Sequence, residues 1–388
     1  MKYNFDKIVN RLNTDSVKWN IKENELPMWI ADMDFEVADE IRDAVNDRAN
    51  HAIYAYTQIS DRWYNAYISW WKTRHNFEIE KDWIVYSSGV IPAISSIIRR
   101  LTSANDKILL QSPVYNNFYN CILNNSRTVI ESELKYDGTS YEIDYEDLEE
   151  KLSDPQTSMM IVCNPHNPVG KIWDKQTLCK IGELCKKHNV TVISDEIHCD
   201  LVDPDFEYTP FSSASETCKE ISITCVAPSK TFNIAGLHTS AVFIPNTELR
   251  SKVSQGFKID EVSSPNVFAV PAAIAALENG AEWLDELRQY IFESKKFAHE
   301  FVSREIPEIK IVPADATYLL WIDLSAVCDD ATHLSDFIFE NTGLHVCAGA
   351  IYGDPGKKFI RVNIACPRSV LEDGLNRLKK GIELYKNR

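Results

Sequence analysis

The chain has 388 residues, 44% of them hydrophobic and 25% charged, and this globular composition excludes a disordered or fibrous protein. It carries 41 lysine and arginine residues against 57 aspartate and glutamate residues, and the resulting net charge of −16 disfavours binding to nucleic acid. No apolar run reaches the roughly 18 residues of a membrane span and no secretory signal is evident, so we expect a cytoplasmic protein with reduced cysteines.

Short apolar runs alternate with helix-like stretches from about residue 83 to residue 237. The runs cover residues 83–86, 108–110, 159–162, 190–193 and 221–226, and polar or Gly/Pro-rich residues follow each of them. The stretch Lys175–His188 has apolar residues at helical spacing. Continuous apolar strands are typical of a sheet that is covered on both faces, so we predict an α/β fold with a mostly parallel central sheet flanked by helices.

The last third of the chain differs from this pattern. Long helical stretches at 282–304 and 370–386 flank strand-like runs at 310–313, 318–323 and 359–364. We predict a large domain over residues 46–275 and a smaller α+β domain over residues 276–388. The first 45 residues do not alternate in this way, and we expect them to pack with the small domain.

Polar side chains with catalytic potential follow the predicted strands. Ligands bind at the carboxyl ends of the strands in such sheets, so we expect these side chains to converge on one site. They are Tyr115, Asn167, Asp195, His198 and Lys230.

Asp195 and Lys230 form the most informative pair. A carboxylate at a buried strand end is either a helix cap or structural ion pair, or the partner of a protonated ring nitrogen. A lysine just after a buried strand loses solvation, which lowers its pKa toward that of a nucleophilic amine. Such an amine suits a cofactor that carries an aldehyde.

Most of the other candidate residues have a purely structural interpretation beside the functional one. The turn at Gly89 before an apolar helix is either a plain turn or an anion site. Asn167 lies in a rigid Asn-Pro turn or donates to a phenolate, and Tyr115 packs in the core or stacks on a flat ring. His198 is structural or a ligand, whereas Arg361 lies in a strand-like run and is expected to meet a carboxylate.

Zinc is the competing chemistry, although no CxxC or HExxH spacing orders the candidate ligands. We therefore predict no metal. The sequence also lacks the GxGxxG, P-loop and GxSxG motifs. The zinc candidates are Cys163, His166, His198, Cys199 and Asp200.

Three motifs, in this order and spacing, resemble the pyridoxal-phosphate enzymes of the class I/II aminotransferase superfamily, fold type I. They are Asn-Pro-His-Asn-Pro-Val-Gly170, Ser-Asp-Glu-Ile-His198 and Ala-Pro-Ser-Lys-Thr-Phe-Asn-Ile-Ala-Gly-Leu237. His198, together with Ala-Asp-Met-Asp-Phe35, resembles the C–S lyase branch, the cystathionine β-lyases. The resemblance runs over essentially the whole chain.

The resemblance implies a role for each matching residue. Lys230 is the Schiff-base lysine that also moves the Cα proton, and Asp195 is the partner of the pyridine nitrogen. Asn167 and His198 donate to the phenolic oxygen of pyridoxal 5'-phosphate. Tyr115 stacks on the cofactor ring, and the backbone of Gly89, Val90 and Ile91 binds the phosphate. Tyr56 contacts the phosphate from the other subunit of a homodimer. Arg361 binds the substrate carboxylate.

Two positions depart from the broad aminotransferase pattern. Ala227 stands where Gly or Ser is usual, and His238 stands where a phosphate-binding Arg is usual. Ser229 and the turn at Gly89 are therefore expected to take a larger share of phosphate binding.

The implied activity is α,β-elimination of a sulfur amino acid, such as cystathionine, cysteine or an S-substituted cysteine, to pyruvate, ammonia and a thiol. Two alternatives stay open at this point. One is an aminotransferase with the same cofactor and lysine, and the other is a regulatory protein on the same scaffold.

Overall fold

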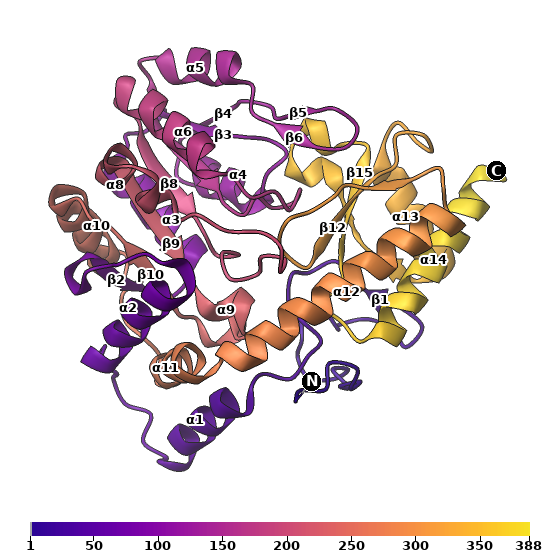
Figure 1. The fold of residues 1–388 in the computed structure, drawn as a ribbon, viewed down its shortest axis with the longest axis horizontal. Coiled ribbons are helices and arrows are strands. Elements are labelled where there is room, and N and C mark those ends of the chain that lie inside the picture. The colour runs from indigo at the N-terminus through magenta and orange to yellow at the C-terminus, as the bar shows by residue number, and fades with distance from the viewer. Residues whose placement is uncertain (1) are drawn as a thin grey trace.

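Seven strands form the central sheet, in the order β2-β10-β9-β8-β7-β3-β4, in a computed structural model that describes residues 2–388 (Figure 1). β3, β4, β7, β8 and β9 are parallel, and β10 is antiparallel to both of its neighbours. The prediction of a mostly parallel sheet is confirmed. The strands are β2 Ile84–Ser87, β3 Lys107–Leu110, β4 Thr128–Glu131, β7 Thr157–Cys163, β8 Thr191–Asp195, β9 Ser222–Val226 and β10 Ser240–Phe243.

Both faces of this sheet are covered by helices, which explains the continuous apolar runs in its strands. Along β7, Met159 and Ile161 belong to one apolar cluster, whereas Met160 and Val162 belong to another on the opposite face. Helices α3 Val90–Leu101, α4 Asn116–Leu123 and α10 Thr247–Ile259 contribute to the first cluster, and α5 Tyr145–Ser153, α6 Lys175–Lys187, α7 Phe211–Ala214 and α8 Glu216–Ile221 contribute to the second.

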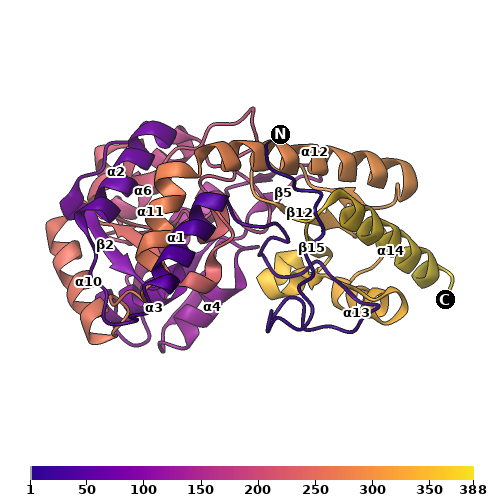
Figure 2. The same cartoon turned by 90° about the horizontal axis from the view of Figure 1, so that it is seen from below.

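A second, smaller sheet lies in the C-terminal part of the chain. Its order is β11-β12-β15-β14, and every pair is antiparallel. Figure 2 shows α12 running from the central-sheet region to this part. The elements are β11 Lys310–Ile311, β12 Leu319–Asp323, β14 Cys347–Ala348, β15 Phe359–Asn363, α12 Ala281–Glu305, α13 Ala331–Thr342 and α14 Arg368–Lys386.

The N-terminal segment contacts mainly the C-terminal part. β1 (Leu26–Pro27) pairs in parallel with β13 (Leu344–His345), and Phe5 packs on the ring of Trp283 in α12. In contrast, α1 (Asp39–Asn50) packs against α11 (Ala269–Asn279), next to α2 (Asp61–His75). The domain boundaries at residues 45 and 275 stay predictions.

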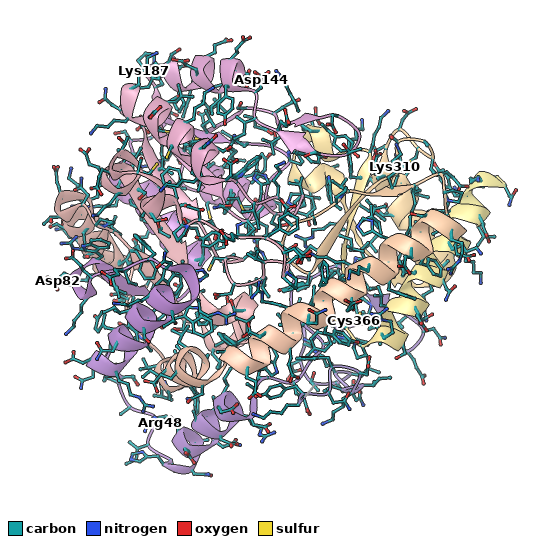
Figure 3. All side chains as sticks on the ribbon, in the orientation of Figure 1. Arg48, Asp82, Asp144, Lys187, Lys310 and Cys366 are labelled. Carbon is teal, nitrogen blue, oxygen red and sulfur yellow. The ribbon has the colours of Figure 1, made fainter. Side chains whose placement is uncertain are left out.

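The remaining elements are short. The hairpin strands β5 and β6 cover Lys135–Tyr136 and Tyr141–Glu142, and the four-residue helix α9 covers Pro228–Thr231. Side chains fill the space between the layers of ribbon (Figure 3). All ten cysteines are free thiols. In residues 2–388, no helix combines the length and the apolar character that crossing a bilayer requires.

Candidate active site

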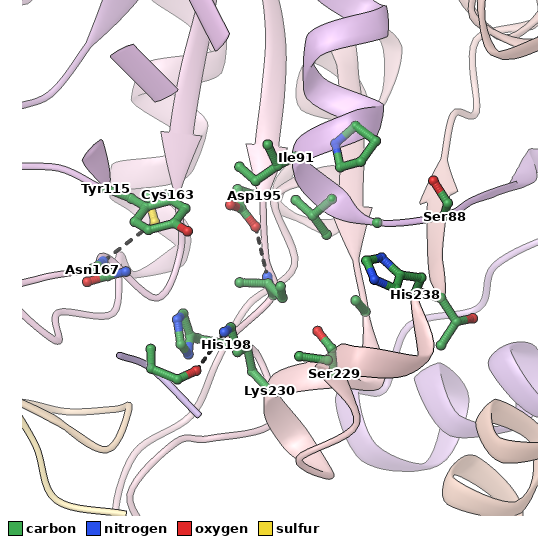
Figure 4. A pocket seen from close by; sticks show the side chains of 18 residues that line it. Ser88, Ile91, Tyr115, Cys163, Asn167, Asp195, His198, Ser229, Lys230 and His238 are labelled. Carbon is green, nitrogen blue, oxygen red and sulfur yellow. Dashed lines mark hydrogen bonds between the residues drawn. The ribbon is translucent and has the colours of Figure 1, made fainter. Parts of the chain in front are cut away.

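A cavity of about 200 Å³ lies where β7, β8 and β9 end (Figure 4). β8 ends two residues beyond its predicted apolar run, so Asp195 is its last residue, paired in register with Cys163 of β7 and Cys225 of β9. The parallel register brings the three polar loops after these strands to one edge of the sheet. Nine predicted site residues line the cavity: Gly89, Val90, Ile91, Tyr115, Asn167, Asp195, His198, Ser229 and Lys230.

One end of the cavity is suited to an anion. Gly89 caps the N-terminus of α3, where backbone N–H groups and the helix dipole favour negative charge. A Cβ at Gly89 would come 3.2 Å from the Cδ atom of Pro92, so glycine leaves this approach open. Ser229 and His238 face the same end (Figure 4), and the buried hydroxyl of Thr239 has no hydrogen-bond partner among the described residues.

Asp195 is a buried carboxylate that has no cationic partner in direct contact within residues 2–388. It accepts one side-chain hydrogen bond, from the backbone N–H of Ile197 at 3.1 Å. Burial raises the pKa of Asp195 to about 7, against a smaller lowering by this hydrogen bond and by Lys230. A protonated ring nitrogen in the cavity would supply the missing positive partner and restore the ionised form.

Lys230 lies on α9 at the opposite wall. Burial, with a smaller contribution from the positive charge of Arg361, lowers the pKa of its amine to about 8. Its Nζ donates a hydrogen bond to the carbonyl oxygen of Ala31 at 2.6 Å. At pH 7, about a tenth of the amine is therefore uncharged and can act as a nucleophile or base.

Arg361 holds Asn167 in a defined orientation. Its Nη1 donates to Oδ1 of Asn167 at 3.1 Å, and its Nη2 donates to the carbonyl oxygen of Trp29 at 3.0 Å. Because the amide oxygen is engaged, the amide nitrogen of Asn167 remains as the donor. The Nε of Arg361 is buried without a partner, so the guanidinium retains an N–H for a carboxylate.

His198 and Tyr115 complete the walls. Burial lowers the pKa of His198 to about 3, so the imidazole is neutral, and its buried Nδ1 has no partner among the described residues. The hydroxyl of Tyr115 receives a hydrogen bond from Asn117 at 2.7 Å, which fixes the ring beside the cavity.

Two predicted residues do not line the cavity. Arg361 contacts it through Asn167, whereas Tyr56 is fully exposed, with a relative exposure of 108%. Tyr56 lies instead in a groove shared with α1 and α11.

Several contacts escaped the sequence reasoning. Ala31 lines the cavity, and its carbonyl oxygen accepts hydrogen bonds from both Lys230 and Tyr318. Asp200 accepts a hydrogen bond from Thr231, the residue after Lys230. The motif around Ala31 was visible in the sequence, but a backbone carbonyl leaves no signal in residue types.

The structure groups possible metal ligands differently from the zinc candidates. Within residues 2–388, one trio lies close together: His75, Cys199 and Asp200. Hydrogen bonds from Trp70, His75 and Thr231 already occupy both carboxylate oxygens of Asp200. These three hydrogen bonds offset the cost of burying the carboxylate of Asp200, so a metal ion is not needed to explain its burial.

The family model for class I and II aminotransferases matches residues 20–378. The chain belongs to this family. It is 41% identical over 386 residues to cystathionine beta-lyase PatB of Bacillus subtilis, covering 98% of this chain and 100% of that one. Cystalysin of Treponema denticola, which contains pyridoxal 5'-phosphate, has a TM-score of 0.94 at 32% identity over 99% of both chains. A pyridoxal-phosphate-bound C–S lyase of Staphylococcus hominis has a TM-score of 0.92 at 30% identity over 98% of both.

The cavity fits pyridoxal 5'-phosphate. The helix terminus at Gly89 suits its phosphate, and the lone carboxylate of Asp195 suits its protonated ring nitrogen. The unpaired Nδ1 of His198 and the free amide nitrogen of Asn167 suit its phenolic oxygen. The partly deprotonated amine of Lys230 suits its aldehyde.

Proposed function

We propose that this protein is a pyridoxal-phosphate-dependent C–S β-lyase that converts cystathionine, cysteine or S-substituted cysteines to pyruvate, ammonia and a thiol. The proposal rests on the observation that Lys230 and Asp195 line the same buried cavity in a chain that is 41% identical to a cystathionine β-lyase. The proposed substrate is thus a small sulfur amino acid. The expected cytoplasmic location stays a prediction.

The cofactor, when bound, supplies an aldehyde that bonds to amines and a ring that takes up the electron pair left when the Cα–H bond breaks. The chain supplies the charges around it. Asp195 keeps a proton on the ring nitrogen, and Asn167 and His198 orient the phenolic oxygen. The N-terminus of α3, with Ser229 and His238, holds the phosphate.

Two basic residues, Arg361 and Lys230, bind the substrate and transfer its proton. Arg361 binds the substrate carboxylate through its unpaired Nε–H, while its other N–H groups keep their bonds to Asn167 and Trp29. Lys230 accepts the Cα proton as general base, since its lowered pKa leaves a lone pair on Nζ. The Cβ–S bond then breaks, the sulfur leaves with the bonding electron pair, and the proton taken up by Lys230 is available to convert it to a thiol.

The first prediction tests this assignment. Purified protein loaded with pyridoxal 5'-phosphate should release pyruvate and a free thiol from cystathionine, both measurable in a coupled absorbance assay. Lys230→Ala removes both the covalent attachment and the base, and should lower the rate at least about a thousandfold and abolish the yellow colour. Brisk exchange with keto acids, without thiol release, would contradict the proposal and indicate an aminotransferase.

A further inference from the structure

The motif Ala-Asp-Met-Asp-Phe, residues 31–35, borders the cavity. Residues 30–35 are here called the Ala31 loop: Ala31 lines the cavity, and its carbonyl oxygen receives two hydrogen bonds. Nζ of Lys230 donates from 2.6 Å, and the buried hydroxyl of Tyr318 donates from 3.0 Å (Figure 4 shows the Lys230 contact). Both lone pairs of this oxygen are thereby used.

The Ala31 loop is fixed on both sides of this carbonyl. Asn363 of β15 donates to the carbonyl oxygens of Ile30 and Asp32, each at 2.6 Å. Asn233, three residues after Lys230, accepts from the N–H of Met33 and donates to the Met33 and Phe35 carbonyl oxygens, each at 3.0 Å. The loop therefore has little freedom to move relative to α9.

The acidic side chains of the motif anchor the loop from behind. Asp34 receives hydrogen bonds from Lys18 at 2.8 Å, Arg11 at 2.6 Å and Trp19 at 2.7 Å. Arg11 also binds Asp32 at 2.9 Å. Lys18 is 1% exposed, so removing Lys18 or Asp34 would leave the other charge buried and unpaired. Because breaking this ion pair is costly, the network holds the loop in place.

We propose that the Ala31 loop is a positioning element that favours elimination over transamination. The inference rests on the proposed function. When Lys230 is released from the cofactor, its amine donates one N–H to the Ala31 carbonyl, and the lone pair takes the Cα proton. The Cα–H bond breaks and an N–H bond forms on Lys230, and the Cβ–S bond breaks with its electron pair leaving on the sulfur.

Transamination requires one further movement of the same amine. The lysine must carry the proton from Cα to a second carbon, on the cofactor, before the sulfur leaves. An amine held at a fixed carbonyl lacks the freedom for this second transfer, whereas elimination does not need it. Asp32 adds a negative charge that stabilises the ammonium formed after the first transfer.

Tyr318→Phe tests the proposal, because it removes one donor to Ala31 and keeps the buried ring. With cystathionine, the ratio of transamination to elimination should rise about tenfold, which corresponds to the loss of one hydrogen bond. It is measured as conversion of the cofactor to its amine form against pyruvate released. Asn363→Ala loosens the loop from β15 and should change the ratio in the same direction.

Tyr290→Phe is the matched control, since its buried hydroxyl binds Asp6 at 2.6 Å, away from the cavity. It should leave the ratio unchanged. A second readout uses the cofactor-free full chain, in which Tyr318→Phe should raise acetylation of Lys230 by acetic anhydride about threefold or more, measured by mass spectrometry, because the amine is held less firmly.

An unchanged ratio in Tyr318→Phe together with unchanged acetylation would overturn the positioning role. A wild-type protein that releases no pyruvate would instead contradict the proposed function, and the acetylation experiment would still report on the contact between Lys230 and Ala31. The two failures are thus distinguishable.

Discussion

At the scale of single residues, the site depends on charges that are costly until the cofactor arrives. Asp195 is fully buried and its pKa is raised to about 7, and the neighbouring Glu196 is also buried with a pKa raised to about 7. A raised pKa in the folded state means that the folded protein binds the proton more tightly than the unfolded chain does. These two carboxyl groups should therefore stabilise the cofactor-free protein more at about pH 5 than at neutral pH.

The second prediction measures this linkage. As pH rises from about 4, the unfolded carboxyl loses its proton first, so stability falls until pH passes about 7. The buried imidazoles of His166 and His198, whose pKa values are lowered, act in the opposite direction, so the effect of Asp195 is measured as a difference between two proteins. Between pH 5 and pH 7.5, the melting temperature of the cofactor-free protein should change by about 3 °C more in the downward direction than that of Asp195→Asn. Cofactor binding should reduce this difference. Equal changes in melting temperature in the two cofactor-free proteins would refute the linkage.

At the scale of elements, the short helix α9 carries the catalytic lysine but has only four residues. A helix this short has little stability of its own and depends on tertiary contacts. Thr231 anchors it from the side away from the cavity, where its hydroxyl donates to Asp200 at 3.0 Å. The same carboxylate receives Trp70 and His75 from α2, so Asp200 joins α9 to α2.

The third prediction concerns this anchor. Thr231→Val keeps the shape of the side chain and leaves Oδ2 of Asp200 without its donor, which costs about 1–3 kcal/mol. We expect kcat to fall about tenfold, with a smaller change in KM, because Lys230 is displaced. Thr231→Ser restores the hydroxyl and should recover most of the rate. Equal activity of the Val and Ser variants would show that the anchor has no role.

At the scale of the whole molecule, the segment between α1 and α2 exposes three large side chains. Ile53 and Tyr54 are each 60% exposed, and Tyr56 is completely exposed. Large apolar side chains that are exposed next to one another are typical of protein interfaces. We therefore propose a homodimer in which each Tyr56 reaches the phosphate end of the partner's cavity.

The fourth prediction tests shared sites by complementation. Tyr56→Ala and Lys230→Ala should each be nearly inactive alone. Co-expressed in equal amounts, they should recover about a quarter of wild-type activity, because half of the dimers are mixed and each contains one intact site. Sedimentation velocity gives the mass of the assembly. No recovery from mixed dimers of confirmed composition would exclude the role of Tyr56 across the interface.

The sequence by itself determined the sheet class and the residue types that surround the cofactor. The apolar runs identified the buried strands because both faces of a parallel sheet exclude water. Asp195 ends one of these strands, and Asn167 and Lys230 lie in the loops after two others. The tertiary structure alone decided the contacts between distant segments. The Ala31 carbonyl meets Lys230 across 199 positions of sequence, and Asp200 meets His75 across 125. Backbone groups look alike in every residue, so only the folded path of the chain selects the carbonyl that faces the catalytic amine.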